Sequence, residues 1–175
     1  MNTMIQSSAE LDHIAKLIEN IPIAMLTTQE PGGALASRPM AVLEMDADGA
    51  LWFFTDTRST KLEQLKTINL GFADLARGTY VSLSGHGEVV TDRLRVVRLW
   101  TAFARPWFPD GPDSPTLALL KITPTAADYW DAPDSKMVRA FGTLASIVAG
   151  KPIAMGQRGS MPNLAASRAS STAGH

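Results

Sequence analysis

The sequence predicts a mainly β domain with flanking helices, in which six antiparallel strands form a small closed or partly open barrel. Six strand-like runs recur along the chain, most of them are joined by turn-forming sequences, and helical segments interrupt them without the strict alternation of a parallel sheet. The length of 175 residues suits one domain. We expect that domain over residues 1–150, with an N-terminal and a C-terminal helix, followed by a disordered tail over 151–175, because the chain from Gln157 onward has almost no apolar periodicity.

Helix-start signals and apolar residues at helical spacing predict four helices. Ser7 and Glu10 have the spacing of a capping box, and the first helix must end before Pro22. Asp92 is a good N-cap for the third helix, which the apolar pattern extends to about Ala104. The predicted helices begin near Ser7, Thr60, Asp92 and Asp134.

Six segments have the composition and the flanking turns of strands. Pro31-Gly32-Gly33 and Asp46-Ala47-Asp48-Gly49 are strong turn signals, so hairpins are the simplest connections around the second strand. Pro39 within that strand indicates a sheet edge, a bulge or a point where the backbone leaves its ladder. The predicted strands cover 23–28, 35–45, 51–55, 69–75, 80–91 and 116–131, with an interruption at Pro124.

Composition argues against several classes of function. A net charge of -1 and a pI near 6.3 provide no basic surface for nucleic acid. The absence of cysteine excludes disulfides, thiolate metal sites and a cysteine nucleophile, and the three histidines are not spaced like metal ligands. No apolar run is long enough to span a membrane, and the N-terminus lacks a signal-peptide pattern. We therefore expect a cytoplasmic protein that binds neither metal, nor membrane, nor nucleic acid.

The third predicted strand leads directly into the second predicted helix. Thr60 and Glu63 have capping-box spacing, and apolar residues at helical intervals continue to Ile68. A helix N-terminus has unpartnered N–H groups and a partial positive charge, so the hydroxyls of Ser59 and Thr60 beside Arg58 and Lys61 could bind a phosphate. An ordinary capped surface helix with a solvated lysine also explains the pattern, and it is the commoner case.

Five short segments form a combination that is far more specific than any one of them. They are Ala36–Met40, Leu51–Thr55, Ser59–Lys61, Trp107–Gly111 and Tyr129–Asp131. Together with the order of elements, they resemble the pyridoxamine 5'-phosphate oxidase-like flavoproteins, and within these the bacterial general stress protein branch. The resemblance covers about residues 8–150. It implies an FMN-binding split β-barrel, usually a homodimer with two flavin sites at the subunit interface.

The resemblance also implies roles for individual residues. A phosphate dianion needs charge-assisted donors, which agrees with a guanidinium and an ammonium near free N–H groups. For the aromatic residues, the sequence alone favours the core of a monomer. By resemblance, the FMN phosphate is held by Arg38, Ser59, Thr60 and Lys61; the isoalloxazine ring is lined, mainly through backbone polar atoms and apolar contacts, by Pro39, Met40, Phe53, Phe54 and Thr55; and Trp107, Phe108 and Trp130 approach from the other subunit.

Two functions of different classes fit these observations. One is a flavin-dependent oxidoreductase with a role in stress response, using FMN or, alternatively, FAD. The other is a stress protein that sequesters or senses flavin without turnover. Pyridoxamine 5'-phosphate oxidation itself is not expected, because the chain end lacks the extra basic residues that hold pyridoxal phosphate. His86 and Glu88 share a strand face, but a polar solvent-exposed face explains them more simply, so the catalytic residues are unknown.

Overall fold

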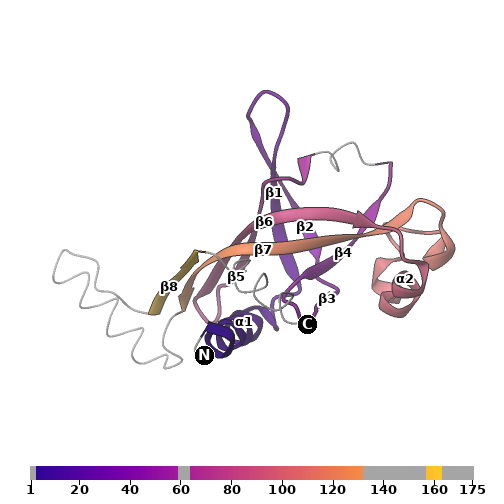
Figure 1. Cartoon of the computed structure of the whole chain (residues 1–175). Helices are drawn as coiled ribbons and strands as arrows, with labels where there is room; N and C mark the ends of the chain where they lie inside the picture. Colours follow the sequence, from indigo (N-terminus) through magenta and orange to yellow (C-terminus); the bar gives the residue numbers. More distant parts are fainter. Residues whose placement is uncertain (1–2, 59–63, 132–156, 163–175) are drawn as a thin grey trace, which may run out of the picture.

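One curled antiparallel sheet forms the centre of the structure (Figure 1). The computed structural model describes residues 3–58, 64–131 and 157–162. Within these ranges the strands are β1 (Ile23–Gln29), β2 (Leu35–Ala41), β3 (Glu44–Met45), β4 (Leu51–Asp56), β5 (Ile68–Asp74), β6 (Thr79–Val90), β7 (Leu117–Asp131) and β8 (Gln157–Pro162). Their order is β2-β1-β5-β6-β7-β4-β3, and β8 pairs with β7. The predicted fold class is confirmed, although the described strands number eight rather than six.

One of the two additional strands arises in the second predicted strand, where the chain passes from one edge of the sheet to the other. Strand β2 pairs with β1 and β3 pairs with β4, so the single predicted strand over 35–45 divides into two. At the division, the Val42 N–H donates to the Pro22 carbonyl and the Leu43 N–H donates to the Trp52 carbonyl, both at 2.9 Å. These two residues therefore join the sheet edges and curl the sheet. Of the three alternatives that Pro39 indicated, the structure shows the sheet edge, because β2 ends the strand order.

The concave side of the sheet holds the main core. Helix α1 (Thr3–Ile18) places Ile14, Leu17 and Ile18 against it. Strand β4 alternates between two clusters: Leu51 and Phe53 face this core, and the residues between and after them face a second cluster. That alternation decides which aromatic residues of β4 can reach a ligand.

The second cluster includes Val96 of helix α2 (Arg93–Leu99), and Figure 1 shows this helix at one end of the long β6–β7 ribbon. The Asp92 carboxylate accepts a hydrogen bond from the Arg95 N–H at 3.1 Å, which confirms the predicted N-cap. The helix ends before the predicted Ala104, because Trp100 takes an extended conformation and packs on Phe54. The chain then enters the short 3₁₀ helix η2 (Ala102–Ala104). Tertiary packing here overrides the local helical pattern.

The helices predicted from Thr60 and from Asp134 can be compared with the structure only in part. The helix expected from Thr60 to Ile68 is wrong at its C-terminal end, because Leu65 and Lys66 are in a turn and Ile68 begins β5. The apolar residues at helical intervals reflect burial of Leu65 and Ile68 in the core rather than a helical face. The start of that helix at 59–63 and the helix expected from Asp134 lie outside the described residues.

Strand β8 differs from the disordered tail predicted from Gln157. Its six residues pair antiparallel with β7 from Ala126 to Asp131. Strand β4 covers only the first half of that edge of β7, from Leu117 to Ile122. The second half can thus accept another strand through backbone hydrogen bonds, which require no apolar periodicity and leave little signal in the sequence.

Strand β7 continues through Pro124, and the interruption predicted there is a shift in its pairing with β6. The register with β6 shifts between Ser84 and Gly85, opposite this proline. A Cβ at Gly85 would lie 2.2 Å from the Thr123 carbonyl oxygen, so the close approach requires glycine.

Among residues 3–58, 64–131 and 157–162, no helix is long and apolar enough to cross a membrane.

Candidate functional site

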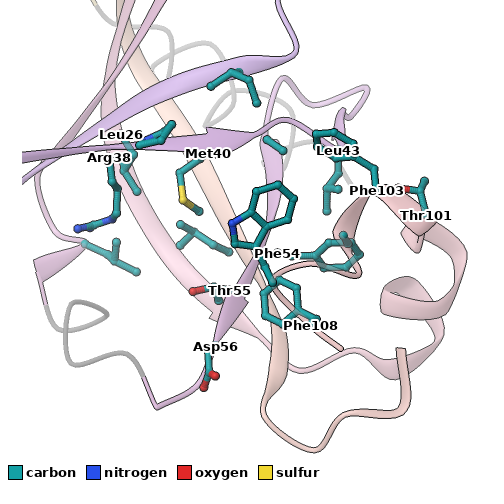
Figure 2. Close-up of a pocket in the computed structure, with 17 residues that line it drawn as sticks. Leu26, Arg38, Met40, Leu43, Phe54, Thr55, Asp56, Thr101, Phe103 and Phe108 are labelled. Carbon is teal, nitrogen blue, oxygen red and sulfur yellow. The ribbon is translucent and has the colours of Figure 1, made fainter. Parts of the chain in front are cut away.

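A cavity of about 490 Å³ lies between β2, β4 and the connection from α2 to β7. Figure 2 shows Arg38 at one end and Thr101 with Phe103 at the other, with Phe54 and Thr55 between them. The lining side chains are almost all apolar, and Arg38 and Asp56 are its ionisable residues within the described parts of the chain. A mostly apolar cavity with a few polar groups at defined positions is typical of a small-molecule or cofactor site.

Arg38 faces inward from β2 and supplies the positive charge of the cavity. Its Nη2 donates to Oγ1 of Thr28 at 3.2 Å, and Thr28 is itself buried. Its Nη1 is buried and has no hydrogen-bond partner among the residues that the structure describes. A buried charged donor without an acceptor is costly, so an anionic group bound here would satisfy it.

The opposite end is a wall of aromatic residues carried by the connection between α2 and β7. The ring of Phe54 contacts the rings of Trp100 and Phe108, with centroids 5.7 and 6.0 Å apart. The rings of Phe103 and Trp107 are tilted against each other at 5.6 Å. We expected Trp107 and Phe108 to approach from another subunit, but within a single chain both already line its own cavity.

The structure brings most of the predicted flavin residues together. Phe53 is fully buried in the main core and Trp130 lies near the end of β7, and neither lines the cavity. Ser59, Thr60 and Lys61 lie outside the described residues. The predicted residues that line the cavity are Arg38, Pro39, Met40, Phe54, Thr55, Trp107 and Phe108.

Sequence reasoning missed ten of the residues that line the cavity, among them Leu43, Asp56, Thr101 and Phe103. Phe103 was expected on the apolar face of a continuous helix, and the break after Leu99 turns it toward the cavity instead. Leu43 comes from the crossing between β2 and β3. A usable signal was the aromatic and proline-rich segment 103–112, whose large rings could not all be buried in a small core.

Asp56 ends β4 at the rim of the cavity and is held by Arg58. The Arg58 Nη2 donates to Oδ2 of Asp56 at 2.6 Å, and both its Nε and its backbone N–H donate to Oδ1, at 3.0 and 2.8 Å. These bonds lower the pKa of Asp56 from 3.8 to about 2, chiefly through the Arg58 side chain and then through its backbone N–H. They also raise the pKa of Arg58. Asp56 is therefore ionised at neutral pH and is not suited to act as a general acid.

We expect the Asp56 carboxyl to titrate near pH 2 in the folded protein. Because its pKa is lowered on folding, its contribution to stability is present above pH 3.8 and is lost as the pH falls toward about 2. Carbon-13 NMR of the carboxyl carbon measures this directly. In an Arg58→Gln variant the pKa should rise toward 3.8, and an unchanged value would show that Arg58 is not the cause.

Within the described ranges, no group of three or more His, Asp or Glu side chains is arranged to hold a metal ion.

Comparison with known proteins identifies relatives along most of the chain. Protein bli-3 of Neurospora crassa is 26% identical over 165 residues, which cover 87% of this chain and 79% of that protein. A protein related to general stress protein 26 of B. subtilis, from Clostridium acetobutylicum, is 27% identical with a TM-score of 0.61, over 71% of this chain and 89% of that one.

A third relative has a name that mentions a ligand. The general stress FMN/FAD binding protein from the phytopathogen Xanthomonas citri is 27% identical with a TM-score of 0.61, over 73% of this chain and 92% of that one. The family model described as pyridoxamine 5'-phosphate oxidase like matches residues 9–153. Since this match spans nearly the whole described barrel, the chain belongs to the pyridoxamine 5'-phosphate oxidase-like family.

Proposed function

We propose that this protein binds FMN, with FAD as the alternative flavin, in the cavity between β2 and β4. The observation that carries the proposal is Arg38, which lines a mostly apolar cavity and whose buried Nη1 has no partner among the described residues. A flavin nucleotide combines a flat aromatic ring system, one side of which is apolar, with an anionic phosphate, so it matches both features of the site. The X. citri relative, described as FMN/FAD binding, supports the same assignment.

Different residues of the site would bind the phosphate and the ring of the cofactor. Arg38 would bind the phosphate, with Ser59, Thr60 and Lys61 as the further donors that the sequence predicts. The segment that lines the ring would come from β2 and β4, and Phe53 would support it from the core side. Bound flavin would supply reversible uptake of electrons or hydride.

A flavin-dependent oxidoreductase with a stress-response role is our preferred function, in keeping with the general stress proteins among the relatives. One observation keeps flavin sequestration or sensing as the second candidate. The ionisable lining residues of the described chain are Arg38 and Asp56, and Asp56 is held ionised by Arg58. Neither residue is a good proton donor at neutral pH, so the described part of the cavity lining supplies no general acid for a substrate.

The purified protein should be yellow, with a flavin absorption spectrum. Replacing Lys61 with alanine should weaken FMN binding by about 1.5 to 3 kcal/mol, the range for hydrogen bonds to a charged group. Riboflavin, which lacks the phosphate, should bind weakly to both proteins. Equal FMN affinity of the two proteins, measured by fluorescence titration, would remove Lys61 from the phosphate site.

Anaerobic addition of a reduced nicotinamide cofactor would separate the two candidate functions, because only a flavin that is reduced at a useful rate supports turnover.

The flavin site is further proposed to be shared by two chains in a homodimer. The cross-strand registers place Met25, Tyr80 and Trp130 on the same convex face of the sheet. Together with Ile23 they are 39 to 43% exposed, and Ile23 also lines the cavity, so this apolar face adjoins the site. A second copy packed on it would cover apolar area and place Trp130 where a partner's site could use it.

A charge introduced on this face should separate the subunits. In a two-fold interface Met25→Glu introduces two like charges, so we expect dimerisation to weaken by at least about tenfold and FMN binding to fall with it. Leu75→Glu is the matched control, because Leu75 is 82% exposed at the start of the β5–β6 turn. Sedimentation velocity over a range of protein concentrations, recorded at a protein and at a flavin wavelength, measures dimerisation and bound FMN for each variant. A wild-type chain that stays monomeric at micromolar concentration with full flavin occupancy would exclude a shared site.

A further inference from the structure

We infer that the aromatic end of the cavity binds a flat ring compound without net charge, as the second reactant beside the flavin. This inference rests on the proposed flavin site and concerns the part of the cavity farthest from Arg38 (Figure 2). Figure 2 places Leu43, Thr101, Phe103 and Phe108 on this side, and Ala104 and Trp107 of the same connection also line the cavity.

The wall is held in place before any ligand arrives. The N–H groups of Trp107 and Phe108 donate to the Ala104 carbonyl at 3.1 and 3.0 Å. The Arg93 guanidinium of α2 donates to the carbonyls of Pro112, Ser114 and Leu117, which fixes the end of the connection to the helix. A connection with this many internal bonds loses little conformational entropy on binding.

The wall nevertheless exposes apolar rings. Phe103 is 62% exposed and Trp107 is 65% exposed, although both line the cavity. Phe54 and Phe108 lie deeper and already contact each other. Large exposed aromatic rings on a pre-formed support are characteristic of surfaces that bind a partner or a ligand, and an aromatic pair favours a stacked or edge-on ring.

Charge decides the class of that ring. None of the six lining residues at this end is ionisable. An anion would bind better at Arg38, and a cation would find the carboxylate of Asp56 already paired with Arg58. A charged group at the wall would lose hydration without a counter-charge in return. The polar groups among these six side chains are the Thr101 hydroxyl, which can donate or accept, and the Trp107 indole N–H, which can only donate, so they suit a ring with few polar atoms.

The test uses two naphthalene compounds that differ in charge. FMN-loaded protein is titrated by calorimetry with 2-naphthol, which is uncharged at pH 7, and with 2-naphthalenesulfonate. We expect saturable binding of 2-naphthol and at least about tenfold weaker binding of the sulfonate. Phe103→Leu, which keeps an apolar side chain but removes the ring, should weaken 2-naphthol by about three- to tenfold. Leu94→Ala is the control, because Leu94 is 85% exposed on α2 and does not line the cavity.

Each outcome has one meaning. Flavin content is measured in the same samples, so a protein without bound FMN would contradict the proposed function itself. Full FMN occupancy with no saturable 2-naphthol binding, or with equal or tighter binding of the sulfonate, would overturn the inference and leave the flavin site intact. Equal affinity of wild type and Phe103→Leu, with melting temperatures unchanged, would overturn it as well.

Discussion

Replacing Phe53 with alanine is expected to lower the free energy of unfolding by about 3 to 5 kcal/mol, the range for truncating a large buried aromatic residue. Phe53 is 0% exposed and lies in the main core with Leu51 and residues of α1. The core around it is formed by strands on several sides, which limits collapse into the space left by the ring. Urea denaturation monitored by circular dichroism measures the loss.

The neighbouring Phe54 provides the contrast. It is only partly buried, lines the cavity and contacts Trp100 and Phe108. Phe54→Ala should cost less stability, about 1 to 3 kcal/mol, and should reduce flavin affinity more than Phe53→Ala does in the folded fraction. Equal losses of stability in the two variants would mean that the strand does not divide its side chains between core and site as described.

Replacing Arg38 with methionine should weaken FMN binding by about 2 to 5 kcal/mol, as truncating one partner of a buried charge pair does. Methionine keeps most of the apolar stem, so the loss reports the guanidinium. The same change should leave the weak affinity for riboflavin nearly unaltered. In the absence of flavin it should cost little stability, since it removes a buried charged nitrogen that has no partner within the described chain.

Arg77→Met is the matched control for Arg38→Met, because Arg77 lies exposed in the β5–β6 turn. It should bind FMN as the wild type does. If Arg38→Met weakened riboflavin and FMN equally, Arg38 would be shaping the ring site and would not be binding the phosphate.

Local patterns predicted the fold class well and its long-range features poorly. Turn signals, alternation and the cap at Asp92 each report on neighbouring residues, and the corresponding elements are confirmed. The division of β2 from β3 depends on which distant strand each half meets, and the end of α2 depends on the packing of Trp100 against Phe54. Strand β8 depends on the half of the β7 edge that β4 leaves uncovered. None of these causes lies within the segment concerned.

The residues of the site show the same contrast between what a local pattern predicts and what the fold decides. Arg38, Pro39 and Met40 were identified by resemblance to a family, and all three line the cavity, while their contact with a flavin stays a prediction. Phe53 was grouped with Phe54 because the two are adjacent, yet the pleat of a strand sends adjacent side chains to opposite faces. Phe103 was missed, because only the break after α2 turns its ring toward the cavity.

The most direct measurement of the central claim is the difference between the affinities of wild-type protein for FMN and for riboflavin, obtained by quenching of flavin fluorescence under identical conditions. The two ligands share the ring and differ by the phosphate that Arg38 is proposed to bind. We predict that FMN binds at least about tenfold more tightly, since one charge-assisted hydrogen bond contributes about 1.5 to 3 kcal/mol. Equal affinity for the two ligands, or no binding of either, would contradict the assignment of this cavity as a flavin nucleotide site.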